Sequence, residues 1–294
     1  MRKEKMENKM DEPISLALKD RMFVELKKSK TAQLGLVIIV LFIFMAIFAP
    51  LISPYNPLDQ DISQRLRPPS KTHLFGTDQL GRDVLSRVIY GSRISLIVGF
   101  SAVFISGIIG IALGMISGFY GGKIDAVIMR LVDIQLSLPF ILLAIAIMAV
   151  LGPGLKNIIL VLGITGWVIY ARIVRGETLK TKNIDFVKAA VALGNSDIKI
   201  LYTHVLPNVL ASAIVVATLE MARMIIMEAA LSFLGLGIQP PIPSWGSMVA
   251  DGRDYITNAW WLITFPGLAI MITVLGINLF GDWLRDSLDP KLRL

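Results

Sequence analysis

Few side chains in this sequence have the types and spacing that catalysis or metal binding requires. The chain has no cysteine and only two histidines, His73 and His204, which stand far apart in the sequence. A thiolate nucleophile, a disulfide and a histidine metal cluster are therefore excluded, and no nucleophile has a base beside it in the pattern that hydrolysis requires. The sequence predicts no catalytic residue, no metal site and no cofactor-binding site, and hence a chain that is not an enzyme.

Nucleotide binding lacks its usual signature as well. A phosphate-binding loop follows the pattern G-x-x-x-x-G-K-[ST], whereas the only Gly-Lys pair here, Gly122-Lys123, is followed by Ile124. If ATP drives this protein, ATP and magnesium must bind to a separate subunit. The net charge of +7 raises the question of nucleic acid. Basic residues beside apolar spans explain it better, so we expect no nucleic-acid partner.

Three charged side chains lie inside one long apolar stretch. Glu220, Arg223 and Glu228 would each cost about 2.5 kcal/mol or more at membrane depth, so they should face protein or water. Glu220 and Arg223 are three residues apart on a helix and can pair. Two interpretations remain open: a salt bridge that fixes helices together, or a polar lining or gate for a charged solute.

The elements that must hold these side chains are long apolar helices. Of the 294 residues, 54% are hydrophobic and 17% charged, whereas soluble domains average about 25% charged. Six stretches approach the roughly 20 apolar residues that a bilayer-spanning helix needs, at 34–52, 94–118, 131–151, 157–174, 209–236 and 259–283. We expect an all-α membrane protein with six transmembrane helices in the lipid bilayer, kinked at Pro139 and Pro266.

Orientation follows from the positive charges between the spans. Twenty Lys and Arg fall on the side of the N-terminus and eight on the other side. Both termini are therefore predicted to be cytoplasmic, which is the N-in, C-in arrangement. Nine of these charges precede the first span within residues 1–33. We interpret this segment with its span as an uncleaved anchor rather than a signal peptide.

Two helical patterns stand out near the second span, one before it and one within it. Between Leu80 and Ile94, apolar residues share one helical face, which predicts a helix lying in the membrane interface. That helix would be a surface strap or, alternatively, a lid over the pathway. Further along, small residues recur at every fourth position, which predicts close packing against another helix. They are Ala102, Ser106, Gly110, Gly114 and Gly118.

The loop at 175–208 is predicted to be cytoplasmic and structured. Asp185 to Leu193 reads as a helix that Gly194 ends as a C-terminal cap. Ser196 can cap a second helix, which Pro207 is expected to bound. The small side chains of Ala189 and Ala190 leave a shallow surface against which another protein could sit.

This loop resembles the EAA loop of permease subunits of bacterial ATP-binding-cassette importers, through Lys188-Ala189-Ala190, Gly194 and Leu206-Pro207. The resemblance implies a coupling helix that docks on an ATPase subunit. Two positions depart from the general pattern: Lys188 stands where glutamate is usual, and His204 where isoleucine is. The residues implied in ATPase coupling are Lys188, Ala189, Ala190, Gly194, Ser196, Asp197, Leu206 and Pro207.

Three further motifs resemble the second permease subunit of the dipeptide, oligopeptide and nickel transporter group. They are Phe75-Gly76-Thr77-Asp78 with Gly81-Arg82-Asp83, then Glu228 to Gly237 with Pro-Ser-Trp-Gly at 243–246, and Gly281 to Asp286 with Leu288-Asp289-Pro290. The resemblance implies a type I importer permease fold in the bacterial cytoplasmic membrane. It divides the chain into a cytoplasmic segment 1–33, a first span with external segment 34–93, and a permease core 94–294.

The implied function is ATP-driven import of peptides, with nickel or a nickel chelate as the alternative substrate. The implied partners are a related permease subunit, two ATP-binding subunits and an external solute-binding protein. The loop at 237–258, with Pro240, Pro241, Pro243 and Trp245, would meet the binding protein. A secondary carrier remains a remote alternative, since the charges in the fifth span suit it but no repeated half is visible.

Overall fold

The computed structural model describes residues 24–288, and the regular secondary structure of this part of the chain is helical, with one isolated bridge between Thr77 and Asp83 and no strand. Its elements follow in the order α3 (Lys30–Ile52), η1 (Ile62–Gln64), α4 (Val84–Tyr120), α5 (Gly122–Leu136), α6 (Phe140–Leu151), α7 (Leu155–Lys182), α8 (Asp185–Ala192), α9 (Asp197–Ile200), η2 (Leu201–Val205), α10 (Leu206–Phe233), α11 (Trp245–Gly252), η3 (Arg253–Tyr255) and α12 (Trp261–Leu288). The basic residues before position 24 lie outside the described residues.

Five helical stretches are long and apolar enough to cross a membrane: α3, α4, α7, the run from α9 to α10, and α12. A sixth crossing requires α5 and α6 together, and these two helices meet at 90°. The prediction of one kinked span at 131–151 is therefore wrong in its geometry. Pro139 has no N–H to donate and disfavours helical backbone in the residue before it, so the helix stops and restarts. Pro266, by contrast, stays inside α12.

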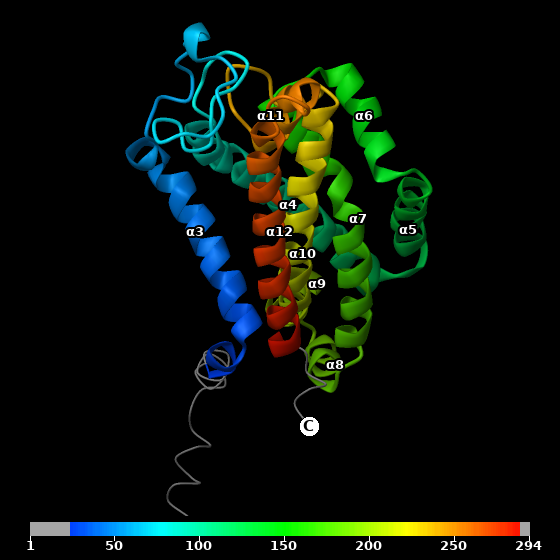
Figure 1. Cartoon of the computed structure of the whole chain (residues 1–294). Coiled ribbons are helices and arrows are strands. Elements are labelled where there is room, and N and C mark those ends of the chain that lie inside the picture. The colour runs from blue at the N-terminus through cyan, green and yellow to red at the C-terminus, as the bar shows by residue number, and fades with distance from the viewer. Residues whose placement is uncertain (1–23, 289–294) are drawn as a thin grey trace, which may run out of the picture.

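The two ends of the bundle differ in what they carry. Figure 1 shows the start of α3, helix α8 and the end of α12 at one end of the molecule, with α11 and the loop 53–83 at the other. The side with α8 is the one that the charge count assigns to the cytoplasm. We call the other end the outer end.

The predicted stripe of small residues on α4 packs against α7. A Cβ at Gly110 would lie 2.4 Å from the Cβ of Tyr170, and one at Gly114 would lie 2.7 Å from the carbonyl oxygen of Ala171. Only glycine lets the two backbones approach this closely. The prediction of close helix packing is confirmed, and the partner helix belongs to the same chain.

Helix α5 is fastened to α7 by polar contacts. The Arg175 guanidinium on α7 donates through Nε and Nη2 to the two oxygens of Asp125, at 2.5 and 2.6 Å. At the other end of α5, the Gln135 amide donates to the carbonyl oxygen of Thr165. Helices α5 and α7 are thus joined near both ends of α5.

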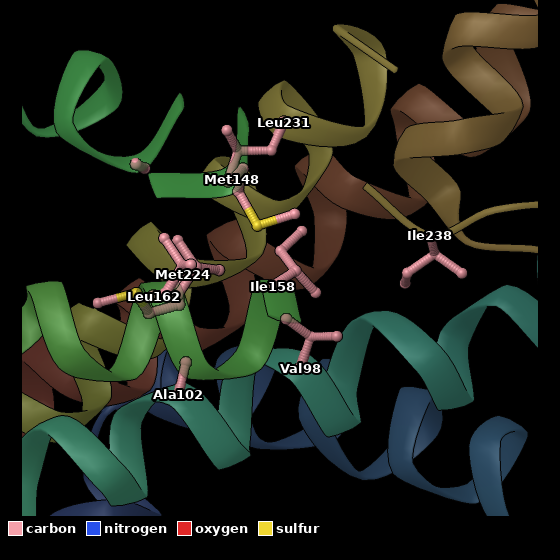
Figure 2. Close-up of a cluster of buried hydrophobic side chains, with 10 residues drawn as sticks. Val98, Ala102, Met148, Ile158, Leu162, Met224, Leu231 and Ile238 are labelled. Carbon is pink, nitrogen blue, oxygen red and sulfur yellow. The ribbon is translucent and has the colours of Figure 1, made fainter. Parts of the chain in front are cut away.

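Helix α6 is held to the bundle by apolar contacts. Met148 is fully buried in a cluster with Val98 of α4, Ile158 and Leu162 of α7, and Met224 of α10. Figure 2 shows these side chains converging between the three longer helices. Between helices in a membrane such contacts stabilise through close van der Waals packing, so the cluster fixes the position of α6 without directional bonds.

The predicted interfacial helix at 80–94 is not a separate element. Helix α4 begins at Val84, with the Asp83 carboxylate capping Ser86 N at 2.7 Å, and runs without a break to Tyr120. Arg82 and Arg87 are 5% and 4% exposed, so they do not face a membrane surface. Pairing with buried carboxylates, which spacing along one helix does not reveal, accounts for this difference. A surface strap is therefore wrong, and α4 also crosses the division proposed at residue 94.

Candidate functional site

The cytoplasmic end carries a short helix–turn–helix. Helix α7 ends at Lys182, α8 begins at Asp185, and Gly194 makes the turn between α8 and α9 with φ of +77°. The side chains of Val187, Ala190, Ile200 and Val205 are buried beneath it with Val174 of α7. This small core fixes the turn on the inner ends of the long helices.

Most of the residues assigned to ATPase coupling face outward. Ala190 is buried and Leu206 is partly buried, whereas the other six are exposed: Lys188, Ala189, Gly194, Ser196, Asp197 and Pro207. The surface also carries exposed apolar side chains outside that set. Leu193 is 83% exposed, Ile198 67% and Tyr202 66%. We call Lys188, Ala189, Leu193, Ile198 and Tyr202 the coupling surface.

Pro207 does not bound a helix as predicted. Helix α10 continues directly from α9 through the π-turn η2, in which the Leu206 N–H reaches the carbonyl oxygen of Leu201. Pro207 has no N–H that could donate to the preceding turn, and a π-turn is one way to accommodate the missing hydrogen bond. The coupling surface is therefore joined to α10 without a loop. Ser196 occupies the N-cap of α9, but its side chain makes no capping hydrogen bond.

Of the charges inside the bundle, Glu228 joins two helices. Its side chain is fully buried, and its two oxygens accept hydrogen bonds from Ser95 of α4 at 3.2 Å and Ser232 at 2.8 Å. Buried carboxylates are stable only when their oxygens are satisfied in this way. The geometry favours a link between α10 and α4, and a role for Glu228 in the solute pathway stays a prediction.

Glu220 and Arg223 pair within α10, with Oε1 and Nη1 3.3 Å apart. A pair inside one helix cannot fasten it to another, so this part of the salt-bridge interpretation does not hold. Arg223 reaches α6 instead, where its guanidinium lies 4.7 Å from the centre of the Phe140 ring. The same arginine lines a cavity of about 260 Å³ at the bend between α5 and α6.

The outer end holds a buried ion network that the sequence analysis missed. Asp78 Oδ2 accepts from Arg82 Nε at 2.6 Å and from Arg87 Nη1 at 3.0 Å, while Arg87 Nη2 lies 3.5 Å from Asp251 on α11. Burial raises the pKa of the Asp251 carboxyl above its ordinary value, and the Arg87 guanidinium opposes this shift. The four-residue spacing of Asp78 and Arg82 was the feature of the sequence that could have predicted this ion pair.

Trp245 closes the same end and is not an external contact residue. It is fully buried, donates from Nε1 to the carbonyl oxygen of Val88 at 3.0 Å, and meets the Phe42 ring edge-on. Pro243 is buried too, whereas Pro240 and Pro241 are exposed. The prediction that Trp245 and Pro243 meet a binding protein is therefore wrong, because both side chains are buried and Trp245 packs between α3 and α4.

Comparison with known proteins decides the family. The family described as binding-protein-dependent transport system inner membrane component matches residues 110–294. This chain belongs to that permease family. A second family, the N-terminal transmembrane domain of oligopeptide transport permease C, matches residues 19–69. The permease is thus a multi-pass protein of the cytoplasmic membrane, and permeases of this family work with ATPase subunits and a solute-binding protein.

Relatives match this permease over nearly their whole length. It is 48% identical over 92% of its residues to the dipeptide transport system permease protein DppC of Alkalihalophilus pseudofirmus, and the match covers 89% of that protein. It is 45% identical over 95% of its residues to the oligopeptide transport system permease protein OppC of Bacillus subtilis, and 92% of that protein is covered. The resemblance inferred from the motifs is confirmed.

A solved structure confirms the fold. The MetNI methionine ABC transporter, in inward-facing conformations, contains a chain that aligns with a TM-score of 0.57 at 21% identity. The alignment covers 68% of the permease and 96% of that chain. The all-α, type I importer permease fold is therefore established, whereas the individual coupling and pathway residues remain predictions.

Proposed function

We propose that this chain is the membrane subunit of an ATP-driven importer that carries short peptides into the cell. The observation that carries the proposal is the near full-length similarity to permeases named for dipeptide, di/tripeptide and oligopeptide transport, at 45–48% identity. The exposed coupling surface supports it, since exposed apolar side chains beside charged ones are typical of a protein–protein contact. A related permease subunit would complete the pathway, and two separate subunits would bind ATP and magnesium.

In the proposed mechanism, the chain itself does no chemistry. Closure of the ATPase pair on ATP would displace the coupling surface, and α7 and α10 would carry the movement into the membrane because both are joined to it directly. Transport is coupled to ATP only if the nucleotide binds the two permease conformations with different affinity. No metal or cofactor bound by this chain is part of the proposal.

The test is uptake into proteoliposomes that contain this permease with its co-purifying subunits. Labelled dipeptides, longer peptides and nickel are offered with the binding protein, with and without ATP. ATP-dependent peptide uptake is the expected result. If only nickel is taken up, nickel and not a peptide is the substrate. Uptake of any solute without ATP would contradict the ATP-driven mechanism.

Gly194→Ala should weaken assembly with the ATPase subunits by about 5- to 30-fold. A Cβ there meets no atom within 4 Å, so the penalty is the left-handed backbone alone, about 1–2 kcal/mol. Gly194→Asn should lose less, because asparagine tolerates that conformation. Affinity is measured by titrating the purified ATPase onto the permease complex.

Gly176→Ala on α7 is the matched control, since its added Cβ also meets open space and its backbone is helical. It should bind the ATPase as the wild type does. Equal binding by Gly194→Ala and the wild type would mean that the turn does not position the coupling surface.

A further inference from the structure

The cavity at the bend between α5 and α6 contains one cation in an otherwise apolar and neutral wall. Its volume is about 260 Å³, and its lining includes Arg223, Gln135, Thr165, Phe140 and Leu143. That is slightly below the usual range for a drug-sized ligand, about 300–1,000 Å³. The cavity therefore has room for one end of a short peptide.

We propose that this cavity binds the C-terminal carboxylate of the transported peptide, and that Arg223 is its anion-binding group. The inference rests on the proposed function, which supplies the peptide. Charged groups within membrane-spanning segments pair with one another or mark substrate pathways, so a charged end of the solute and Arg223 are suited to each other.

Arg223 has the donors that a carboxylate requires. In the described part of the chain, its hydrogen bonds involve only Nη1, which donates to Glu220 at 3.3 and 3.5 Å. Nε and Nη2 remain available, and an arginine can present two parallel N–H groups to a carboxylate. The side chain is 34% exposed, so a ligand in the cavity can reach it.

The surroundings hold the guanidinium in place. Phe140 lies beneath it at 4.7 Å, and Glu220 behind it is only 7% exposed. The Gln135 amide is occupied by the Thr165 carbonyl oxygen. Arg223 is thus the charged side chain that a ligand in the cavity meets.

The position along the helices suits a transport intermediate. Thr165, Gly166, Val168 and Ile169 of the lining lie half-way along α7, which runs from Leu155 to Lys182. A site there is about equally far from the two ends of this helix. The apolar residues around it can accept a peptide side chain of any moderate size, which leaves side-chain selection to the binding protein.

The test captures the peptide in the cavity during transport. The photoreactive substitution Leu138→benzoylphenylalanine is placed at the cavity wall, and Leu142→benzoylphenylalanine serves as control. Leu142 is on the same bend region and 58% exposed, but does not line the cavity. Complexes in proteoliposomes are irradiated under ATP with a radiolabelled dipeptide delivered by saturating binding protein, and the label on this chain is counted.

We expect label at position 138 and not at 142, and a drop of at least about tenfold in the Arg223→Gln background, the loss that one charged hydrogen bond corresponds to. Arg223→Lys should restore most of the label. In the wild-type background, an excess of unlabelled free-carboxylate dipeptide should compete, and the C-terminal amide should not. The amide comparison needs no change at Arg223, so it remains valid if Arg223→Gln misfolds.

Two results would overturn the assignment. One is that the C-terminal amide competes as well as the free-carboxylate dipeptide. The other is that positions 138 and 142 are labelled equally while the complex still takes up peptide under ATP. If ATP-driven peptide uptake itself is absent, the proposed function fails instead, so the two failures can be told apart.

Discussion

Gly110→Ala should prevent this permease from reaching its folded state in amounts that survive purification. The added Cβ would lie 2.4 Å from the Cβ of Tyr170 and 2.5 Å from the carbonyl oxygen of Trp167. Neither atom is the end of a flexible side chain, so α4 and α7 must move apart along their shared contact. Overpacking costs about 1–3 kcal/mol in ordinary cores and more where backbone is displaced. The measurement is the yield and the thermal midpoint of the monodisperse complex in detergent.

Gly107→Ala is the matched control, because it adds the same methyl group three residues away on the same helix. There the nearest atom is Cε1 of Tyr170 at 3.7 Å, an ordinary van der Waals contact. Alanine also has a helix propensity about 1 kcal/mol better than glycine. Gly107→Ala should therefore be neutral or slightly stabilising, and equal behaviour of the two variants would refute the close contact.

Asp78→Ala should destabilise the outer end by about 3–5 kcal/mol, the usual loss when one member of a buried ion pair is removed. Two arginines depend on this carboxylate: Arg82 and Arg87 have side chains only 6% and 5% exposed. Asp78 Oδ1 also accepts the backbone N–H of Leu80 and Arg82, so the turn at 78–82 loses its organising group. Limited proteolysis of the loop 53–83, together with the thermal midpoint, should report the loosening.

Asp254→Ala removes a carboxylate from an exposed pair and serves as the control. The side chains of Asp254 and its partner Arg253 are 75% and 63% exposed. Such surface pairs contribute about 0–1 kcal/mol to the free energy of unfolding. The thermal midpoint of Asp254→Ala should match that of the wild type. If Asp78→Ala is as stable and as protease-resistant as Asp254→Ala, the buried network does not hold the outer end.

The parts of this fold that the sequence predicted are those that depend on local composition. Apolar length located the spans, and the four-residue repeat of Ala102 to Gly118 located a contact face, because each signal is contained within one helix. The partner of that face could not be read, since it is formed by residues of α7 that lie about 57 to 60 positions further along the chain. Gly194 was read correctly as a turn because a positive φ favours glycine wherever it occurs.

The parts that failed depend on contacts between distant segments. Arg82 and Arg87 looked like surface charges because their neutralising partners, Asp78 and Asp251, come from a loop and from α11. Trp245 looked exposed because it follows a proline-rich loop, yet its pocket is made by α3 and α4. Pro139 was expected to kink a helix and instead separates two, since the 90° turn is stabilised by packing of α6 that no local pattern encodes.

Because Arg175 of α7 is paired with Asp125 of α5, a tilt of α7 would move α5 as well. At about 1.5 Å per residue, the 28 residues of α7 give an arm of roughly 42 Å that ends two residues before α8. A tilt of about 5° applied at α8 would displace the far end by about 4 Å and the mid-helix by about 2 Å. Because α5 is fastened to α7, it would move with α7. Helix α10, by contrast, is joined to the coupling surface separately, through α9 and η2. The width of the cavity between them would then change by most of a water diameter for a tilt that leaves every helix intact.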